Sequence, residues 1–169
     1  EIWTLHIFCF AITSATMYLT FKTAGKLLSK QKQTIILGLM LVYIPFQMYS
    51  LFYYSDSLMV ILVALIIYVL IPSDGSFIFR SKHIIAVAVI VAFGWNLRSN
   101  IIIIIPALIV YLLFFKWYKN LLLLIVTFGI SFVIFGKGFD MLWSHYGFVQ
   151  DAGYRFPMLH WVMMGMSIQ

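Results

Sequence analysis

Charged side chains are scarce in this sequence, and acidic ones are the scarcest. Only 9% of the 169 residues are charged, and five of them are Asp or Glu. Hydrophobic residues make up 64% of the chain, and its mean hydropathy is +1.05. A soluble domain of this size has too little interior to bury so much apolar surface. The sequence therefore predicts an integral membrane protein whose apolar runs are helices, because a membrane-spanning backbone must satisfy its own hydrogen bonds.

Several chemical signatures are also missing. The single cysteine, Cys9, excludes a disulfide framework and a cysteine metal cluster. The sequence has no phosphate-binding or dinucleotide-binding glycine pattern, no GxSxG and no HExxH. The net charge is +6, but the eleven basic residues are scattered between apolar runs, so we expect no nucleic-acid partner.

The chain begins at Glu1, without an initiator methionine. Residues 2–19 also lack the basic region and the small-residue cleavage site of a signal peptide. We therefore expect the sequence to be an internal piece of a longer protein.

Six apolar segments alternate with polar connections along residues 1–135, which we interpret as a transmembrane helical region. Residues 136–169 are a mixed tail, interpreted as an extracytoplasmic loop with a re-entrant or interfacial segment. The predicted fold class is all-α: a polytopic transmembrane helical bundle with about six membrane segments and this tail, together part of one larger membrane domain. The segments cover residues 2–21, 34–52, 57–71, 84–96, 101–115 and 121–135.

Basic residues are distributed unevenly between the two sides of this predicted bundle. Alternating the segments across a bilayer places eight basic residues on one side and three, Arg98, Lys137 and Arg155, on the other. By the positive-inside rule, the lysine-rich loops face the cytoplasm. We therefore expect a multi-pass cell-membrane protein with Arg98 and residues 136–169 on the extracytoplasmic side.

Arg98 is the strongest candidate for a functional side chain. It lies between Asn96 and Asn100, immediately before the apolar run 101–115. A charge at the bilayer centre costs about 2.5 to 3.5 kcal/mol, so we expect a short turn at the membrane boundary rather than one long helix. Snorkelling to the headgroup layer is one explanation of this arginine. The functional alternative is a clamp for a phosphate or a carboxylate.

Asp56 is a second candidate on the same predicted side. Either Ser55 or Asp56 caps the N-terminus of the third segment, or Asp56 also shapes a polar site at the outer surface. Lys137 and Arg155 are the other outer cations and can bind a lipid phosphate.

No metal site is predicted within the chain, and no cofactor is evident. The tail contains His145 and His160, with Asp140 and Asp151 in the same region. These residues do not have the short spacing typical of metal ligands.

Three short stretches resemble known sugar transferases. Residues 54–58, Tyr-Ser-Asp-Ser-Leu, resemble the Tyr-Ser-Glu-Ser-Leu-like stretch of GPI-type mannosyltransferases. Arg98-Ser99-Asn100, with the isoleucine-rich run containing Pro106, is similar to a Thr-Arg-x-Asn segment of those enzymes. Residues 156–166 are similar to a Pro-x-x-His-Trp-x-x-Met-Gly stretch in multi-span, glycosyltransferase-like proteins of Gram-positive bacteria. The whole chain resembles the middle of a GT-C type polytopic glycosyltransferase.

The resemblance implies an activity and a set of site residues. A hexose would move from a polyprenyl-phosphate-linked donor in the lipid bilayer to a glycan or cell-envelope polymer on the extracytoplasmic side. The catalytic carboxylate, and any divalent metal of the full-length protein, would belong to a loop upstream of Glu1. Two alternatives stay open: a lipid flippase or transporter, and a non-catalytic membrane scaffold. The candidate substrate-binding residues are Asp56, Arg98, Asn100, Lys137, Arg155 and His160.

Overall fold

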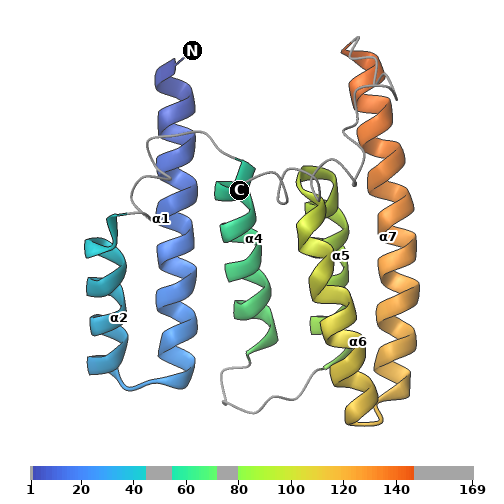
Figure 1. Ribbon diagram of the computed structural model, residues 1–169, viewed down its shortest axis with the longest axis horizontal. Helices are drawn as coiled ribbons and strands as arrows, with labels where there is room; N and C mark the ends of the chain where they lie inside the picture. Colours follow the sequence, from blue (N-terminus) through green and yellow to red (C-terminus); the bar gives the residue numbers. More distant parts are fainter. Residues whose placement is uncertain (1, 45–54, 72–79, 147–169) are drawn as a thin grey trace, which may run out of the picture. The chain divides into compact units, whose positions relative to one another are not determined.

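The described part of the chain is helical and contains no strand. The computed structural model describes residues 2–44, 55–71 and 80–146 (Figure 1). The all-α class predicted from the sequence is confirmed for these residues. The elements are α1 (Ile2–Leu27), α2 (Lys30–Val42), α4 (Ser55–Leu70), α5 (Ser81–Leu97), the 3-10 helix η1 (Ser99–Ile103), α6 (Ile104–Phe114) and α7 (Tyr118–His145).

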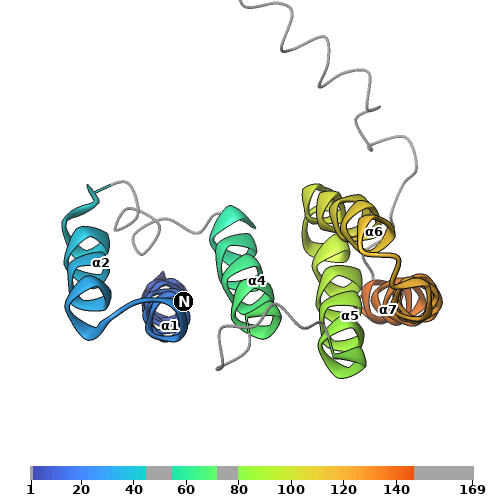
Figure 2. The ribbon, with the colours of Figure 1, turned by 90° about the horizontal axis from the view of Figure 1, so that it is seen from below.

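The chain divides into two compact units, Glu1–Phe135 and Gly136–Gln169. In the first unit, α1, α4 and α6 run in one direction, and α2 and α5 run in the opposite direction (Figure 1). Helix α1 packs against α2 and α4, α4 packs against α5, and α5 packs against η1 and α6 (Figure 2). The start of α4 and the end of α5 therefore lie at one end of this unit. The end of α1, the start of α2, the end of α4 and the start of α5 lie at the other (Figure 1).

A core of buried aliphatic side chains joins α4, α5, η1, α6 and the start of α7. The buried residues on α5 recur three and four positions apart, which places them on one face of the helix. The buried residues of η1 and α6 also recur three and four positions apart. The apolar face of α5 therefore packs against the apolar face formed by η1 and α6. The core residues are Ile66, Ile84, Val87, Ala88, Val91, Ile101, Ile105, Leu108, Leu112 and Leu124.

Two of the described helices are long and apolar enough to cross a membrane. The candidate spans are His6–Leu27 in α1 and Tyr118–Leu142 in α7. Three further apolar helices, Leu58–Leu70, Ser81–Leu97 and Ser99–Phe114, are shorter than the roughly 20 residues that span a bilayer comfortably. The number of six membrane segments therefore stays a prediction.

Helix α1 extends beyond the segment predicted from the sequence. It ends at Leu27 rather than at Phe21, so Lys22 and Lys26 are helical and do not belong to a connecting loop. The sequence prediction ended this segment at Phe21 because charged residues follow it. The chain contains no proline in this region, however, and lysine has a good helix propensity.

Lys26 joins α1 to the end of α4. Its Nζ donates hydrogen bonds of 2.7 Å to the carbonyl oxygens of Tyr68 and Ile71. The ammonium also lies 3.6 Å from the centre of the Tyr68 ring. The last carbonyls of a helix have no partner within the helix and carry partial negative charge, so a cation stabilises them.

The boundaries of α2 also differ from the prediction. It starts at Lys30 instead of Thr34 and ends at Val42, where Tyr43 adopts an extended conformation. The Tyr43 N–H still donates to the carbonyl of Leu39 at 2.9 Å, so the last turn of α2 is closed at this residue. The remainder of the predicted segment, residues 45–52, lies outside the described residues.

Helix α7 continues through the position where the last segment was predicted to end. The prediction placed Gly136 and Lys137 in the tail, whereas α7 continues to His145. Glycine in a helix interior costs about 1 kcal/mol relative to alanine, which does not suffice to end an apolar helix without a proline. Lys137 is therefore an exposed helical residue.

A tight turn connects α6 to α7. The N–H of Trp117 donates to the carbonyl of Leu112 at 2.9 Å, and the N–H of Lys116 donates to the carbonyl of Leu113 at 3.0 Å. This pair of bonds is a Schellman motif, which needs a residue with left-handed backbone angles at its centre. Lys116 occupies that position with φ of 56°.

Changing Lys116 to glycine should stabilise the protein by about 1 kcal/mol, because glycine adopts positive φ without steric cost. The measurement is thermal unfolding in detergent micelles. Lys119→Gly is the control: this residue lies in the first turn of α7, where glycine should be neutral or destabilising. Equal effects of the two substitutions would contradict the assigned turn.

Candidate functional site

Arg98 closes the connection between α5 and η1. Its backbone is extended, and it is both the C-cap of α5 and the N-cap of η1. Its N–H donates to the carbonyl of Gly94 at 2.8 Å, and its carbonyl accepts from the N–H of Ile101 at 3.4 Å. The predicted break is confirmed, and the alternative of one continuous helix through Arg98 is excluded. The arginine is half-buried at the tip of two apolar helices.

The two asparagines beside Arg98 have different environments. Asn96 is half-buried, and its Nδ2 donates to the carbonyl of Ala92 at 3.0 Å, which ties the side chain to its own helix. Asn100 is the second residue of η1 and is exposed. Of the two, Asn100 is therefore better placed to contact a ligand beside Arg98.

Gly94 allows close packing directly below this turn. A Cβ at this position would lie 2.6 Å from Cδ1 of Ile101 and 3.0 Å from Cδ1 of Leu62. Gly94 is buried, and its carbonyl accepts the Arg98 N–H. The absence of a side chain here thus sets how closely α5 approaches both η1 and α4. We did not single out this glycine from the sequence, where its only signal is its position four residues before Arg98.

Gly94→Ala is expected to destabilise the protein by about 1 to 3 kcal/mol, because an extra methyl in a packed core forces its neighbours to shift. Gly129→Ala is the matched control, since a Cβ at Gly129 would meet nothing within 4 Å. Unfolding in detergent, monitored by circular dichroism, measures both variants. A Gly94→Ala protein as stable as the control would show that the packing is looser than described.

Asp56 is the second residue of α4, and its side chain lies outside the described part of the structure. Because α4 begins at Ser55, two residues before the predicted start, Ser55 and Asp56 are both helical and neither is the residue that caps the helix. An acidic residue in the first turn still complements the helix dipole. The start of α4 and the end of α5 lie at the same end of the first unit (Figure 1). The fold thus places the Asp56 backbone and the Arg98 turn at one end, without showing a contact between them.

The remaining candidates are not brought together with Arg98 by the described structure. Lys137 lies in the part of α7 that belongs to the second unit. Arg155 and His160 lie outside the described residues. Their roles stay predictions.

Within residues 2–44, 55–71 and 80–146, no three His, Cys, Asp or Glu side chains are grouped closely enough to hold a metal ion. The chemistry available at the Arg98 turn is that of a half-buried arginine and an exposed asparagine two residues later. Such a pair can bind an anionic group and a hydroxyl.

Comparison with known proteins gives one family. Residues 1–136 match the family model described as "Dolichyl-phosphate-mannose-protein mannosyltransferase". The comparisons with curated proteins and with solved structures gave no match.

Proposed function

The chain belongs to the dolichyl-phosphate-mannose-protein mannosyltransferase family, and from this premise we propose that it transfers a sugar from a polyprenyl-phosphate-linked donor to a cell-envelope acceptor outside the cytoplasm. The family membership agrees with the resemblance found in the sequence and makes the protein a membrane glycosyltransferase of the GT-C type. The observation that carries the proposal is the position of Arg98, half-buried at the turn between α5 and η1.

The proposed role of Arg98 is to bind the phosphate of the donor. When the sugar leaves, negative charge develops on the phosphate oxygens. A positioned guanidinium stabilises that charge and accepts two oxygens at once through its fork of N–H groups. The half-buried position strengthens this interaction, because fewer water molecules compete for the phosphate.

The other candidates have supporting roles in the proposal. Asn100 and Asp56 would bind hydroxyl groups of the sugar or the acceptor. Lys137, Arg155 and His160 would bind the donor or the acceptor from the tail. The catalytic carboxylate is proposed to precede Glu1 in the sequence, so activity is tested in the full-length protein.

The direct test is a transfer assay with the full-length protein in liposomes. Polyprenyl-phosphate mannose with a radiolabelled sugar is the donor, and a cell-envelope extract is the acceptor. Label that moves from the lipid fraction to the extract supports the proposal. Movement of the donor between leaflets without transfer would instead establish the flippase alternative.

The proposed orientation predicts the accessibility of introduced cysteines. Asn100→Cys should react with a membrane-impermeant thiol reagent added outside intact cells, whereas Lys30→Cys should react only after permeabilisation. Both positions are exposed in the structure. The background is low because the native Cys9 is 1% exposed. Reaction of Asn100→Cys only from the cytoplasmic side would contradict the orientation and remove Arg98 from the proposed site.

A further inference from the structure

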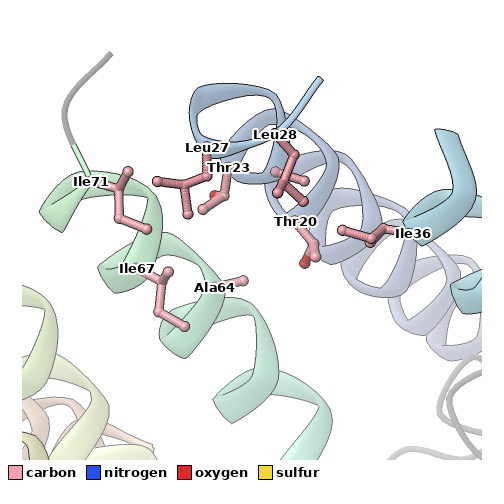
Figure 3. A pocket seen from close by; sticks show the side chains of 9 residues that line it. Thr20, Thr23, Leu27, Leu28, Ile36, Ala64, Ile67 and Ile71 are labelled. Carbon is pink, nitrogen blue, oxygen red and sulfur yellow. The ribbon is translucent and has the colours of Figure 1, made fainter. Parts of the chain in front are cut away.

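An apolar groove of about 250 Å³ lies between α1, α2 and α4 (Figure 3). It is separate from the Arg98 turn and contains none of the candidate site residues. Small side chains on facing helices open this space, since threonine and alanine stand where larger residues would fill it. Its lining includes Thr20 and Thr23 of α1, Ile36 of α2, and Ala64, Ile67 and Ile71 of α4.

The polar groups that line the groove need no hydrogen bond from its occupant. The Thr20 hydroxyl donates to the carbonyl of Thr16 at 2.9 Å, and the Thr23 hydroxyl donates to the carbonyl of Leu19 at 2.8 Å. Both hydroxyls are thus satisfied within α1, and the rest of the lining is aliphatic. A narrow apolar groove with satisfied walls fits a hydrocarbon chain.

Lysine side chains lie close to one end of the groove, either in contact with a lining residue or near one in the sequence. Ile71 lines it, and the carbonyl of the same residue accepts a hydrogen bond of 2.7 Å from Lys26 Nζ. Leu28, which also lines it, is two residues before Lys30. Lys30 and Lys32 are in the first turn of α2 and are exposed, in contrast to the half-buried Lys26. Lys32 lies four residues before the lining residue Ile36, so the two share a face of α2.

Arg80 and Lys82, at the start of α5, add positive charge at this end of the helices. His83 precedes the apolar residues 84–96, and its Nδ1 is buried without a hydrogen-bond partner. Burial lowers the pKa of His83, and the charges of Lys82, Arg80 and Lys26 lower it further. Among the described residues of the first unit, the acidic residue is Asp56, which belongs to the start of α4. The described residues at this end therefore carry several positive charges that can attract an anion.

We propose that this groove binds one acyl chain of an anionic glycerophospholipid, whose phosphate lies against Lys30 and Lys32 at the start of α2. The satisfied apolar walls select the chain, and the exposed lysines select the charged headgroup. The site is independent of the proposed transfer reaction, since its α4 residues lie in the half of that helix that is remote from Asp56, and none of its lining belongs to α5 or η1. It is therefore distinct from the proposed site for the phosphate of the sugar donor.

The test uses photo-crosslinking with the full-length protein in phosphatidylcholine nanodiscs. A phosphatidylglycerol with a diazirine in its acyl chain is the probe, and a phosphatidylcholine with the same chain is the reference. Cross-linked peptides are identified by mass spectrometry. We expect labelling of α1, α2 and α4 around the groove by the phosphatidylglycerol probe at several times the level given by the reference.

Two pairs of variants separate the chain from the headgroup. Ile36→Trp fills the groove and should reduce the labelling, whereas Ile35→Trp should not, because Ile35 is 60% exposed on the same helix and does not line the groove. Replacing Lys30 or Lys32 by glutamine should remove most of the phosphatidylglycerol preference. Lys119→Gln, remote from the groove in sequence, should leave it unchanged.

Each contrary result overturns a named part of the proposal. Equal labelling by the two probes would exclude headgroup selection, and undiminished labelling of Ile36→Trp would exclude the groove. Displacement of the probe by polyprenyl phosphate but not by unlabelled phosphatidylglycerol would assign the groove to the sugar carrier. Protein–protein cross-links across the groove would assign it to a second copy of the chain. Retained helicity by circular dichroism shows that each variant is folded.

Discussion

Replacing Arg98 by alanine is expected to lower the rate of sugar transfer by about 100-fold to 1,000-fold, the loss typical when one preorganised donor to a developing negative charge is removed. The protein should still insert and fold. The Arg98 backbone makes the hydrogen bonds that shape the turn, and alanine retains them. Initial rates with the polyprenyl-phosphate-linked donor measure the effect on transfer.

Two further variants make this result specific. Arg98→Lys keeps the charge but loses the two-pronged guanidinium, so it should recover only part of the activity. Lys119→Ala removes an exposed cation at the start of α7 and should leave the transfer rate unchanged. Full activity of Arg98→Ala would show that the arginine serves only to anchor the turn at the membrane surface.

Replacing Lys26 by methionine should lower the free energy of unfolding by about 2 to 3 kcal/mol, because hydrogen bonds to a charged group and a cation–π contact are lost together. Methionine keeps the length of the side chain but cannot donate to the carbonyls of Tyr68 and Ile71. Those carbonyls then lose their partner at the end of α4. Equilibrium unfolding in mixed detergent micelles measures the change.

Lys22→Met is the matched control for Lys26. Lys22 lies one turn earlier on α1, is exposed, and has its Nζ 5.5 Å from the centre of the Tyr18 ring. Its replacement should change stability by no more than about 0.5 kcal/mol, as for most surface substitutions. Equal losses in the two variants would show that the bonds of Lys26 to α4 contribute little.

The helical class and the break at Arg98 were predictable because they depend on local rules. A continuous apolar run specifies a buried or membrane helix, and an arginine between two asparagines specifies an interruption. The boundaries were less predictable. Lys26 looked like a loop residue, since its partners are 42 and 45 positions away and nothing near it in sequence reveals them.

The candidate site was predicted in part. The sequence pointed to Arg98, but the importance of Gly94 depends on contacts with Leu62 and Ile101, which only the packed helices bring together. The lipid groove was missed for a similar reason. The small residues Thr20, Thr23 and Ala24 can indicate either close packing of two helices or a groove between them. Which of the two forms depends on the facing residues of α4, which the sequence pattern does not reveal.

The hairpin formed by α5 and α6 has a consequence for the insertion of the chain into the membrane during synthesis. Both helices are apolar, they meet at a turn, and they pack on each other through local contacts. In the proposed orientation, this turn must cross the hydrocarbon layer of the membrane during insertion. Arg98 is the one basic residue of the turn. Transferring one arginine costs a few kcal/mol, which the aliphatic residues on both sides can offset. The pair can therefore enter the membrane as a single unit during synthesis.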